Sequence, residues 1–295
     1  MTLQLLFQSI AFGIFIGALY GLAAVGFSFI FGVMRILNIA HGELIMLGGY
    51  VTFLLFSKWH MDPFLSLPLV AGLLFLVGIV IYKMFFSHLV KFREELRTNT
   101  SLRVSFGLIL ILEQTAVLSF SADERSVVPA YSGGGLDILG VQLPYLRLGI
   151  LIIALVLIFG LQLFLNKTLL GKAIRATAEN WESATLMGID VTKTYLISFA
   201  SATAFAGMAG SMIVVGYSIN PAIGLEWILK AMVISIMAGV GSIGGAFIAG
   251  LLLGVAEAIS AIFLGPYMQL VGLLIFLFIL MVRPQGLFGR QRARV

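Results

Sequence analysis

Long apolar segments, separated by short polar stretches, make up most of this sequence. A membrane-spanning helix needs about 20 mostly apolar residues to cross about 30 Å of hydrocarbon. The pattern therefore predicts an all-α fold, a polytopic transmembrane helical bundle of about eight to nine spans, some of them broken. The predicted spans cover residues about 7–33, 38–57, 66–87, 102–121, 148–166, 194–215, 228–241, 243–264 and 267–283.

Two connections between these spans each have two interpretations. Residues 34–37 separate the first two spans, and they form either a cytoplasmic turn or a break inside the membrane. The span at 228–241 is short, so it either crosses alone or shares a broken helix with 243–264. Irregular backbone at membrane depth persists only where it is buried in protein or lines a cavity.

The composition supports a membrane protein, because only 11% of the residues are charged, against about 25% in soluble domains. No stretch outside the spans is long enough for a core of its own, so residues 1–295 form a single transmembrane domain. The absence of cysteine excludes disulfides and thiolate metal sites. Without a G-x-x-x-x-G-K-[ST] motif or metal-ligand spacing, we expect no cofactor, no metal, no nucleic-acid partner and no enzymatic activity in this chain.

Basic residues are distributed unevenly between the two sides of the predicted bundle. Fourteen of the 18 Lys and Arg residues fall on one side, and cytoplasmic loops are the ones enriched in them. This predicts a multi-pass protein of the cell inner (plasma) membrane, with the N-terminus outside and the C-terminus in the cytoplasm. In the tail, Arg290, Arg292 and Arg294 are expected only to anchor the chain to anionic membrane lipid. The outer side keeps Lys58, Arg125, Arg147 and Lys230.

Small residues recur at a spacing of four in three of the spans. This spacing places them on one helix face, where they allow the close backbone approach on which helix packing in lipid depends. The pattern predicts a tight bundle and says nothing about substrate. The residues are Gly13, Gly17 and Gly21, then Ser198, Ala202, Ala206 and Gly210, then Ala246, Gly250 and Gly254.

A charged, amphipathic stretch at 167–193 interrupts the apolar pattern between two spans. A helical segment of this length at the cytoplasmic surface of a membrane protein usually binds a partner there. We therefore interpret 167–193 as the contact surface for a cytoplasmic partner. Its candidate contact residues are Glu179, Glu182, Ser183, Ala184 and Gly188.

Three polar side chains, Asn38, His41 and Glu43, lie within six residues at the start of a span. Asn38 is a candidate helix cap, and the N–H groups of a helix N-terminus favour anions. Charged groups at membrane depth are costly and mark either function or pairing. Glu43 either pairs with Arg35 or His41 and fixes the turn, or the segment lines a pathway and changes conformation. For the segment as a whole, we favour the pathway role.

Residues 239–244, Gly-Val-Gly-Ser-Ile-Gly, match G-x-G-x-x-G. A dinucleotide site would need a preceding strand and a soluble βαβ unit, which apolar spans exclude. Two interpretations remain, a flexible turn or close helix crossing, and a break whose exposed backbone lines a pathway, as in transporters with discontinuous helices. The candidate residues of this segment are Gly239, Gly241, Ser242 and Gly244.

Other polar features carry weaker signals. Glu113, Gln114 and Glu257 lie well inside spans, and with no basic partner in a span they are weak evidence for a proton pump. Residues 121–147 form the one long extracytoplasmic loop. Its length of about 25 residues exceeds most loops in compact proteins, which favours a docking surface for a soluble partner over a solvated connection.

Three segments resemble one family. Residues 32–43 resemble the GxxRxxNxAHGE segment of LivH-type permeases, which are membrane subunits of branched-chain amino acid ABC importers. Glu182-Ser183-Ala184, followed three residues later by Gly188, resembles the EAA-xxx-G coupling loop of ABC-importer permeases, with Ser183 where the general motif has Ala. Residues 283–289 resemble the family's C-terminal RPQGLFG. With 239–245 included, the similarity runs from near residue 10 to residue 289.

This resemblance implies an ATP-driven importer. The chain would be one permease, paired with a second homologous (LivM-like) permease and two ABC ATPase subunits that bind ATP and Mg. The coupling loop would insert into a groove on an ATPase subunit, and a periplasmic substrate-binding protein would deliver the ligand. The resemblance favours branched-chain amino acids, with urea, short amides or aromatic acids as alternatives. From the residues alone, a stand-alone ion-coupled transporter is a further alternative. A membrane-embedded enzyme is disfavoured, because no intramembrane catalytic constellation is found.

Overall fold

The structure, a computed structural model, describes residues 3–138 and 140–289, so the predicted lipid-anchoring residues Arg290, Arg292 and Arg294 lie outside the described residues. The helices are α1 (Leu3–Met34), α2 (His41–Trp59), α3 (Pro63–Ile81), α4 (Glu94–Phe120), α5 (Tyr145–Lys167), α6 (Leu169–Glu179), α7 (Trp181–Leu186), α8 (Val191–Gly216), α9 (Ile223–Ala238), α10 (Ile243–Leu264) and α11 (Met268–Val282). A π-helical turn (Tyr82–Phe86) extends α3, and short 3-10 turns cover Leu89–Lys91 and Gly265–Tyr267.

Each predicted span coincides with one helix, which confirms the all-α polytopic class. By length and composition, the described residues contain six segments able to cross a membrane, and the last of them joins α10 and α11. Neither α2, with 19 residues, nor α9, with 16, is among the six. The span number of about eight to nine therefore stays a prediction.

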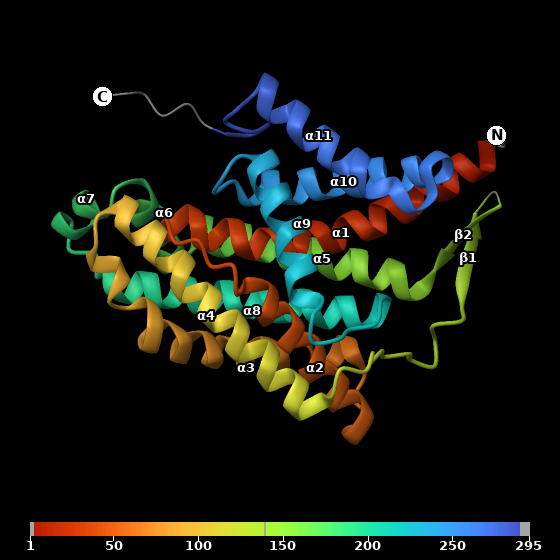
Figure 1. The fold of residues 1–295 in the computed structure, drawn as a ribbon, viewed down its shortest axis with the longest axis horizontal. Coiled ribbons are helices and arrows are strands. Elements are labelled where there is room, and N and C mark those ends of the chain that lie inside the picture. Colours follow the sequence, from red (N-terminus) through yellow and green to blue (C-terminus); the bar gives the residue numbers. More distant parts are fainter. Residues whose placement is uncertain (1–2, 139, 290–295) are drawn as a thin grey trace.

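Helix α1 lies along the centre of the bundle and contacts α5, α8, α9 and α10 (Figure 1). Its glycine stripe packs against the small residues of α10. A Cβ on Gly13 would lie 2.6 Å from Val255 Cα, and one on Gly17 would lie 2.7 Å from Leu251 Cα. No side chain fits at these crossings, so the predicted stripes on α1 and α10 form one tight antiparallel contact.

A second close contact joins α2 to α8. Gly48 lies against the Gly207 backbone, and Gly210 lies against the carbonyl oxygen of Ile45. Between the same helices, the Thr52 and Ser211 hydroxyls share a hydrogen bond of 2.5 Å. The small face predicted on the sixth span therefore packs against α2 at Gly210.

The bundle has two chemically different ends. One end carries a hairpin of β1 (Gly135–Ile138) and β2 (Val141–Pro144), which α1 holds through Gln4 and Gln8 (Figure 1). The Gln8 amide donates to the Gln142 carbonyl and accepts from the Gln142 N–H, both at 2.9 Å. This hairpin was not predicted within loop 121–147. Helices α6 and α7 and the segment 283–289 lie at the opposite end.

Candidate functional site

The chain between α1 and α2 is irregular, and α4 satisfies its backbone. Arg35 has a left-handed φ of 55°. Thr98 Oγ1 donates to the Arg35 carbonyl at 2.9 Å, and Ser101 Oγ accepts from the Leu37 N–H at 3.1 Å. Ser105 Oγ donates to the Leu37 carbonyl at 3.0 Å. A row of hydroxyls on one helix therefore replaces the hydrogen bonds that the break removes, as buried irregular backbone requires.

A buried arginine closes the end of α1 beside this break. Arg97 is 4% exposed, and its guanidinium donates to the carbonyl of Met34 at 3.2 Å. It also donates to Val90 and Phe92 at 3.0 and 3.1 Å. Ile36 is fully buried, whereas Arg35 and Leu37 are partly exposed. The segment is an irregular, partly buried break between two helices, and its depth in the membrane stays a prediction.

Asn38, His41 and Glu43 lie together at the start of α2, and all three are at most 2% exposed. Both amide atoms of Asn38 and Oε2 of Glu43 have no hydrogen-bond partner in the part of the chain that the structure describes. The His41 ring meets the Ala23 backbone, without a hydrogen bond of ordinary geometry. The expected cap by Asn38 is therefore wrong, and Glu43 does not bond to His41. Most buried polar atoms in folded proteins are paired, so this cluster calls for an explanation.

Glycines on neighbouring helices make room for these side chains. A Cβ on Gly26 of α1 would lie 2.7 Å from His41 Cε1, and a Cβ on Gly224 of α9 would collide with the Glu43 carboxylate. Gly42 in turn lies directly against the Gly224 carbonyl. The N-terminal ends of α2 and α9 therefore meet inside the bundle, next to the orphaned groups.

Residues 239–242 form the turn between α9 and α10. Gly239 and Gly241 have φ of 94° and 86°, which favour glycine, and Ser242 Oγ caps α10 by accepting from the Gly245 N–H at 3.2 Å. α9 and α10 are separate helices rather than halves of one broken helix. The Gly241 N–H donates to Ser28 Oγ of α1 at 3.2 Å, and a cavity of about 350 Å³ is lined by this turn.

The C-terminal segment packs against this turn. The Leu287 N–H donates to the Met237 carbonyl and the Phe288 N–H to the Ala238 carbonyl, both at 2.8 Å. These bonds satisfy the last carbonyls of α9, which would otherwise lack partners. From the sequence, residues 283–289 were singled out only by their resemblance to a family motif. Their packing on α9 could not be predicted, because backbone hydrogen bonds do not depend on the type of side chain.

The predicted coupling loop, 167–193, folds as two helices at a bundle end. Thr168 caps α6, and Asn180 ends α6 and caps α7 by accepting from the Ser183 N–H at 2.9 Å. Glu179, Glu182 and Ser183 are exposed. Ala184 is 3% exposed and anchors α7 to the bundle.

Gly188 ends α7 in a left-handed conformation. Its φ is 81°, its N–H donates to the Thr185 carbonyl, and the Ile189 N–H donates to the Ala184 carbonyl, both at 3.0 Å. This pair of bonds is a Schellman C-cap, which selects glycine. A Cβ at Gly188 would meet nothing within 4 Å, so its surroundings are open.

A cavity of about 250 Å³ links the coupling loop to the break. Arg35 and Arg97 line it from one side, and Trp181 and Glu182 line it from the other. The structure thus brings the predicted coupling loop next to the chain that leads to Asn38. The turn 239–244 contacts α1 separately, through Ser28 and Gly32.

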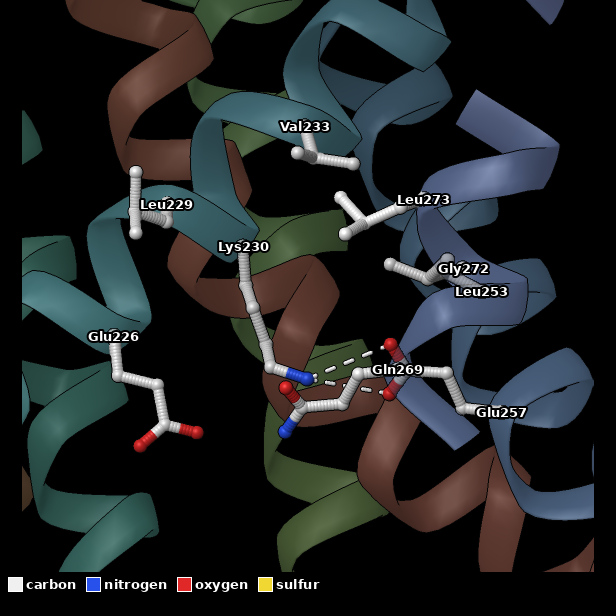
Figure 2. Close-up of a pocket in the computed structure, with 9 residues that line it drawn as sticks. All are labelled: Glu226, Leu229, Lys230, Val233, Leu253, Glu257, Gln269, Gly272 and Leu273. Atoms are coloured by element: carbon white, nitrogen blue, oxygen red, sulfur yellow. Dashed lines mark hydrogen bonds and ion pairs between the residues drawn. The ribbon is translucent and has the colours of Figure 1, made fainter. Parts of the chain in front are cut away.

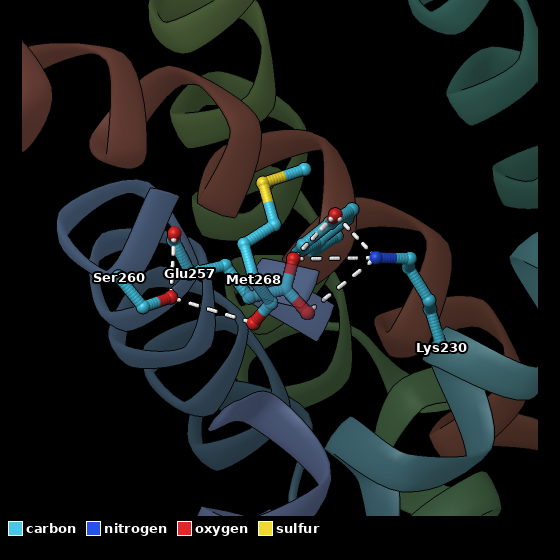
Figure 3. Close-up of polar contacts among 5 residues, drawn as sticks. Lys230, Glu257, Ser260 and Met268 are labelled. Carbon is cyan, nitrogen blue, oxygen red and sulfur yellow. Dashed lines mark hydrogen bonds and ion pairs between the residues drawn. The ribbon is translucent and has the colours of Figure 1, made fainter. Parts of the chain in front are cut away.

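An ion pair inside the bundle was missed by sequence reasoning. Lys230 Nζ of α9 lies 3.2 Å from Glu257 Oε2 of α10 and donates to Tyr20 Oη at 2.6 Å (Figure 3). The Tyr20 hydroxyl donates to Glu257 Oε2 at 2.8 Å. The expectation that Glu257 has no basic partner is therefore wrong, while the placement of Lys230 on the outer side stays a prediction. A lysine and a glutamate in successive apolar segments were the available signal, because charges at depth need partners.

Loop 121–147 is fixed to the bundle at its own end. The Tyr131 hydroxyl donates to Asp62 Oδ2 at 2.7 Å, and burial together with that carboxylate raises the pKa of Tyr131. Arg125 and Ile219 exchange two backbone hydrogen bonds of 2.8 and 2.7 Å. These contacts therefore give the loop a defined conformation, and the hairpin is part of it.

Comparisons with known proteins agree with this geometry. A family model described as "Branched-chain amino acid transport system / permease component" matches residues 9–282. The permease BraD of Pseudomonas aeruginosa is 31% identical over 96% of this chain and 95% of its own. LivH of Salmonella typhimurium is 28% identical over 94% of both chains. A protein of Methanocaldococcus jannaschii named "Probable branched-chain amino acid transport permease protein LivH" is 29% identical over 91% of this chain and 88% of its own.

No solved structure matches the chain significantly. The family match covers nearly the whole helical bundle, from α1 to the end of α11, and so includes the break, the coupling loop and the ion pair. These chains are transport components rather than enzymes. The chain belongs to the family of permease components of branched-chain amino acid transport systems.

Proposed function

We propose that this chain is a membrane permease subunit of an ATP-driven ABC importer for branched-chain amino acids. The observation that carries the proposal is the family match over residues 9–282, joined to an exposed helical pair at one end of the bundle. ATP and Mg belong to partner subunits.

The coupling loop is the docking surface for an ABC ATPase. Helix α7 leaves large apolar side chains in the open, with Trp181 47% exposed, Leu186 87% and Met187 83%. Aromatic and Met side chains are enriched in protein–protein interfaces. A cluster of such side chains with this much exposed surface indicates that a partner protein binds here. Glu182 and Ser183 lie on the same short helix and supply polar contacts.

Docking reaches the pathway through the break. Glu182 of α7 and Arg35 line the same cavity, so a displacement of α7 on ATPase binding would change the surroundings of Arg35. Arg35 begins the irregular chain that ends at Asn38. Asn38, His41 and Glu43 gate the pathway, and Gly239, Gly241, Ser242 and Gly244 form the flexible turn at its side. Half-buried helix ends beside a central site are typical of transporters with alternating access.

The complete importer contains a second, LivM-like permease, two ATPases and a periplasmic binding protein. The N-terminus lies outside and the C-terminus in the cytoplasm, with about eight to nine spans in the inner membrane. The hairpin end then faces the periplasm and receives the binding protein, while α6 and α7 face the ATPases. Arg290, Arg292 and Arg294 anchor the tail to lipid.

The function is tested by transport in vesicles that contain the full complex, with and without ATP, across a panel of branched-chain amino acids, urea, amides and aromatic acids. Uptake of leucine, isoleucine and valine that requires ATP is expected. Uptake driven by a proton gradient without ATPase subunits would establish the ion-coupled alternative instead. Preference for urea or amides would correct the substrate.

The coupling loop is tested by Gly188→Arg and Glu182→Lys. Neither position is buried, so the bundle should fold, while ATPase co-purification and transport are lost. Gly265→Arg is the matched control, because Gly265 also has a positive φ, of 51°, and a Cβ there also meets nothing within 4 Å, but it lies outside the coupling loop. Normal ATPase capture by Gly188→Arg would refute this docking site.

Orientation has its own test, because the chain lacks cysteine. Ala130→Cys should react with an impermeant thiol reagent added outside whole cells, and Ser183→Cys only after the membrane is opened. The reverse pattern would overturn the orientation and the periplasmic role of the hairpin.

A further inference from the structure

Two cavities of different chemistry meet at the Lys230 ion pair. One, of about 460 Å³, has a mixed lining with many polar groups, which include Glu124, Ser218 and Asn220. The other, of about 180 Å³, is lined by aliphatic side chains, which include Leu229, Val233 and Leu273. Glu226, Lys230 and Gln269 line both cavities, so the polar and apolar spaces adjoin there.

Figure 2 shows this division directly. The aliphatic side chains of Val233 and Leu273 lie on one side of the close-up, and the tips of Glu226, Lys230 and Gln269 lie on the other. A ligand seated across the boundary would therefore place a charged end among the charged tips and an apolar end among the aliphatic groups.

The charged tips offer both signs to a ligand. The Glu226 carboxylate is exposed and forms no ion pair or hydrogen bond to any residue that the structure describes. An ammonium has three donors, and Lys230 directs one to Tyr20 Oη and a second to Glu257 Oε2. Its remaining contact, to Glu257 Oε1, is long at 3.5 Å, so a donor is available for another carboxylate.

We propose that the junction of these cavities is a substrate subsite for zwitterionic α-amino acids with aliphatic side chains. Glu226 binds the ligand ammonium, Lys230 and the Gln269 amide bind the ligand carboxylate, and the side chain enters the space between α9, α10 and α11. This inference rests on the proposed function and deepens it, because it locates the step at which the permease itself contacts the amino acid.

Glu257 and Tyr20 act as positioning residues for this subsite. They hold the Lys230 ammonium at the boundary and leave its third N–H group free to bind a ligand. A largely buried lysine without such partners would be costly, so the pair keeps a cation available where the two cavities meet. Binding is expected to be weak, because tight binding in one state would slow the transport cycle.

The test is ligand protection of a single cysteine. Leu229→Cys places a thiol in the apolar cavity, and Leu225→Cys, one turn earlier on α9, is the matched control because Leu225 lines neither cavity. Each variant is assembled in the full importer in phosphatidylglycerol nanodiscs and labelled with a small maleimide. L-leucine should slow labelling only at Leu229→Cys, about tenfold at a concentration about ten times Kd.

Two analogues and two further variants separate the recognition groups. 4-Methylpentanoate lacks the ammonium and 3-methylbutylamine lacks the carboxylate, so each should protect much less than L-leucine. Adding Lys230→Met or Glu226→Gln should remove the protection by L-leucine. Equal protection by either analogue, equal protection at both cysteines, or no labelling at Leu229→Cys because lipid or a partner covers it would each overturn the subsite.

Transport selectivity gives an independent measurement. Leu273→Trp fills the apolar cavity and should lower the ratio of leucine to alanine uptake several-fold, whereas Leu274→Trp, exposed on the same helix and outside the cavity, should not. An unchanged ratio in Leu273→Trp would contradict the subsite. If the wild-type complex imports leucine but neither experiment responds, this inference fails alone. If it imports no branched-chain amino acid, the proposed function fails.

Discussion

Removing one member of the Lys230–Glu257 pair should destabilise the bundle far more than removing both. The side chains are 15% and 7% exposed, so the pair belongs to the buried regime, where one unpaired charge costs about 3–5 kcal/mol, rather than to the surface regime of about 0–1 kcal/mol. Lys230→Met leaves the carboxylate with the Tyr20 hydroxyl alone and should cost about 3–5 kcal/mol.

Glu257→Leu should cost less, about 1–3 kcal/mol, because the lysine stem can carry its ammonium toward the polar cavity and water. The double variant Lys230→Met/Glu257→Leu leaves no charge and should lie within about 1 kcal/mol of the native chain. At about 2–4 °C per kcal/mol, Lys230→Met should lower the Tm by roughly 6–20 °C.

The assay is thermal unfolding of the purified importer in detergent, followed by size-exclusion fluorescence, as a double-mutant cycle. The native chain, the two single variants and the double variant are compared under identical lipid and salt. The reasoning is refuted if the single effects simply add in the double variant, because the pair then contributes no coupling energy. Equal losses in both single variants would refute the asymmetry that we derive from the cavity.

Three further outcomes are expected. Gly17→Leu should abolish folded protein, because even a Cβ there would lie 2.7 Å from Leu251 Cα. The control Gly72→Leu should be tolerated, because a Cβ at Gly72 meets nothing within 4 Å. The yield of monodisperse complex measures both outcomes. Asn38→Ala should lower the maximal transport rate without changing substrate preference and without lowering the Tm, since it removes buried amide atoms that form no hydrogen bond. Altered preference at normal rate would make Asn38 a selectivity residue. Gln8→Leu should release the hairpin and weaken stimulation by the binding protein, and unchanged stimulation would exclude the hairpin as its docking surface.

The sequence predicted helices and faces well, because both depend on local periodicity. A spacing of four places Gly13 and Gly17 on one side of α1 whatever lies opposite. It does not name the partner helix, since several spans carry similar stripes. The structure supplies that information by packing Gly17 against Leu251, more than two hundred residues away.

Interactions between distant polar groups were harder to predict. Asn38, His41 and Glu43 were recognisable because they are adjacent in sequence, but their hydrogen bonding depends on what α1, α8 and α9 place around them. Lys230 and Glu257 are 27 residues apart and each looked isolated. The turn at 239–242 and the packing of both helices on α1 bring them side by side. The role of Leu287 as a donor to α9 is a backbone property and has no side-chain signature.

The orphaned groups and the coupling loop can be compared on one energy scale. An unsatisfied buried polar group costs about 1–3 kcal/mol, so Asn38 and Glu43 at the start of α2 together hold about 2–6 kcal/mol. Reversing a two-state equilibrium from 1:99 to 99:1 requires about 5.5 kcal/mol of differential binding. If an ATPase docks at α7 as we propose, differential binding of that size would be enough to move α2 to a second arrangement that pairs these groups. The break at Arg35 is where such a shift would be absorbed, because its backbone is held by the hydroxyls of Thr98, Ser101 and Ser105 rather than by a continuous helix.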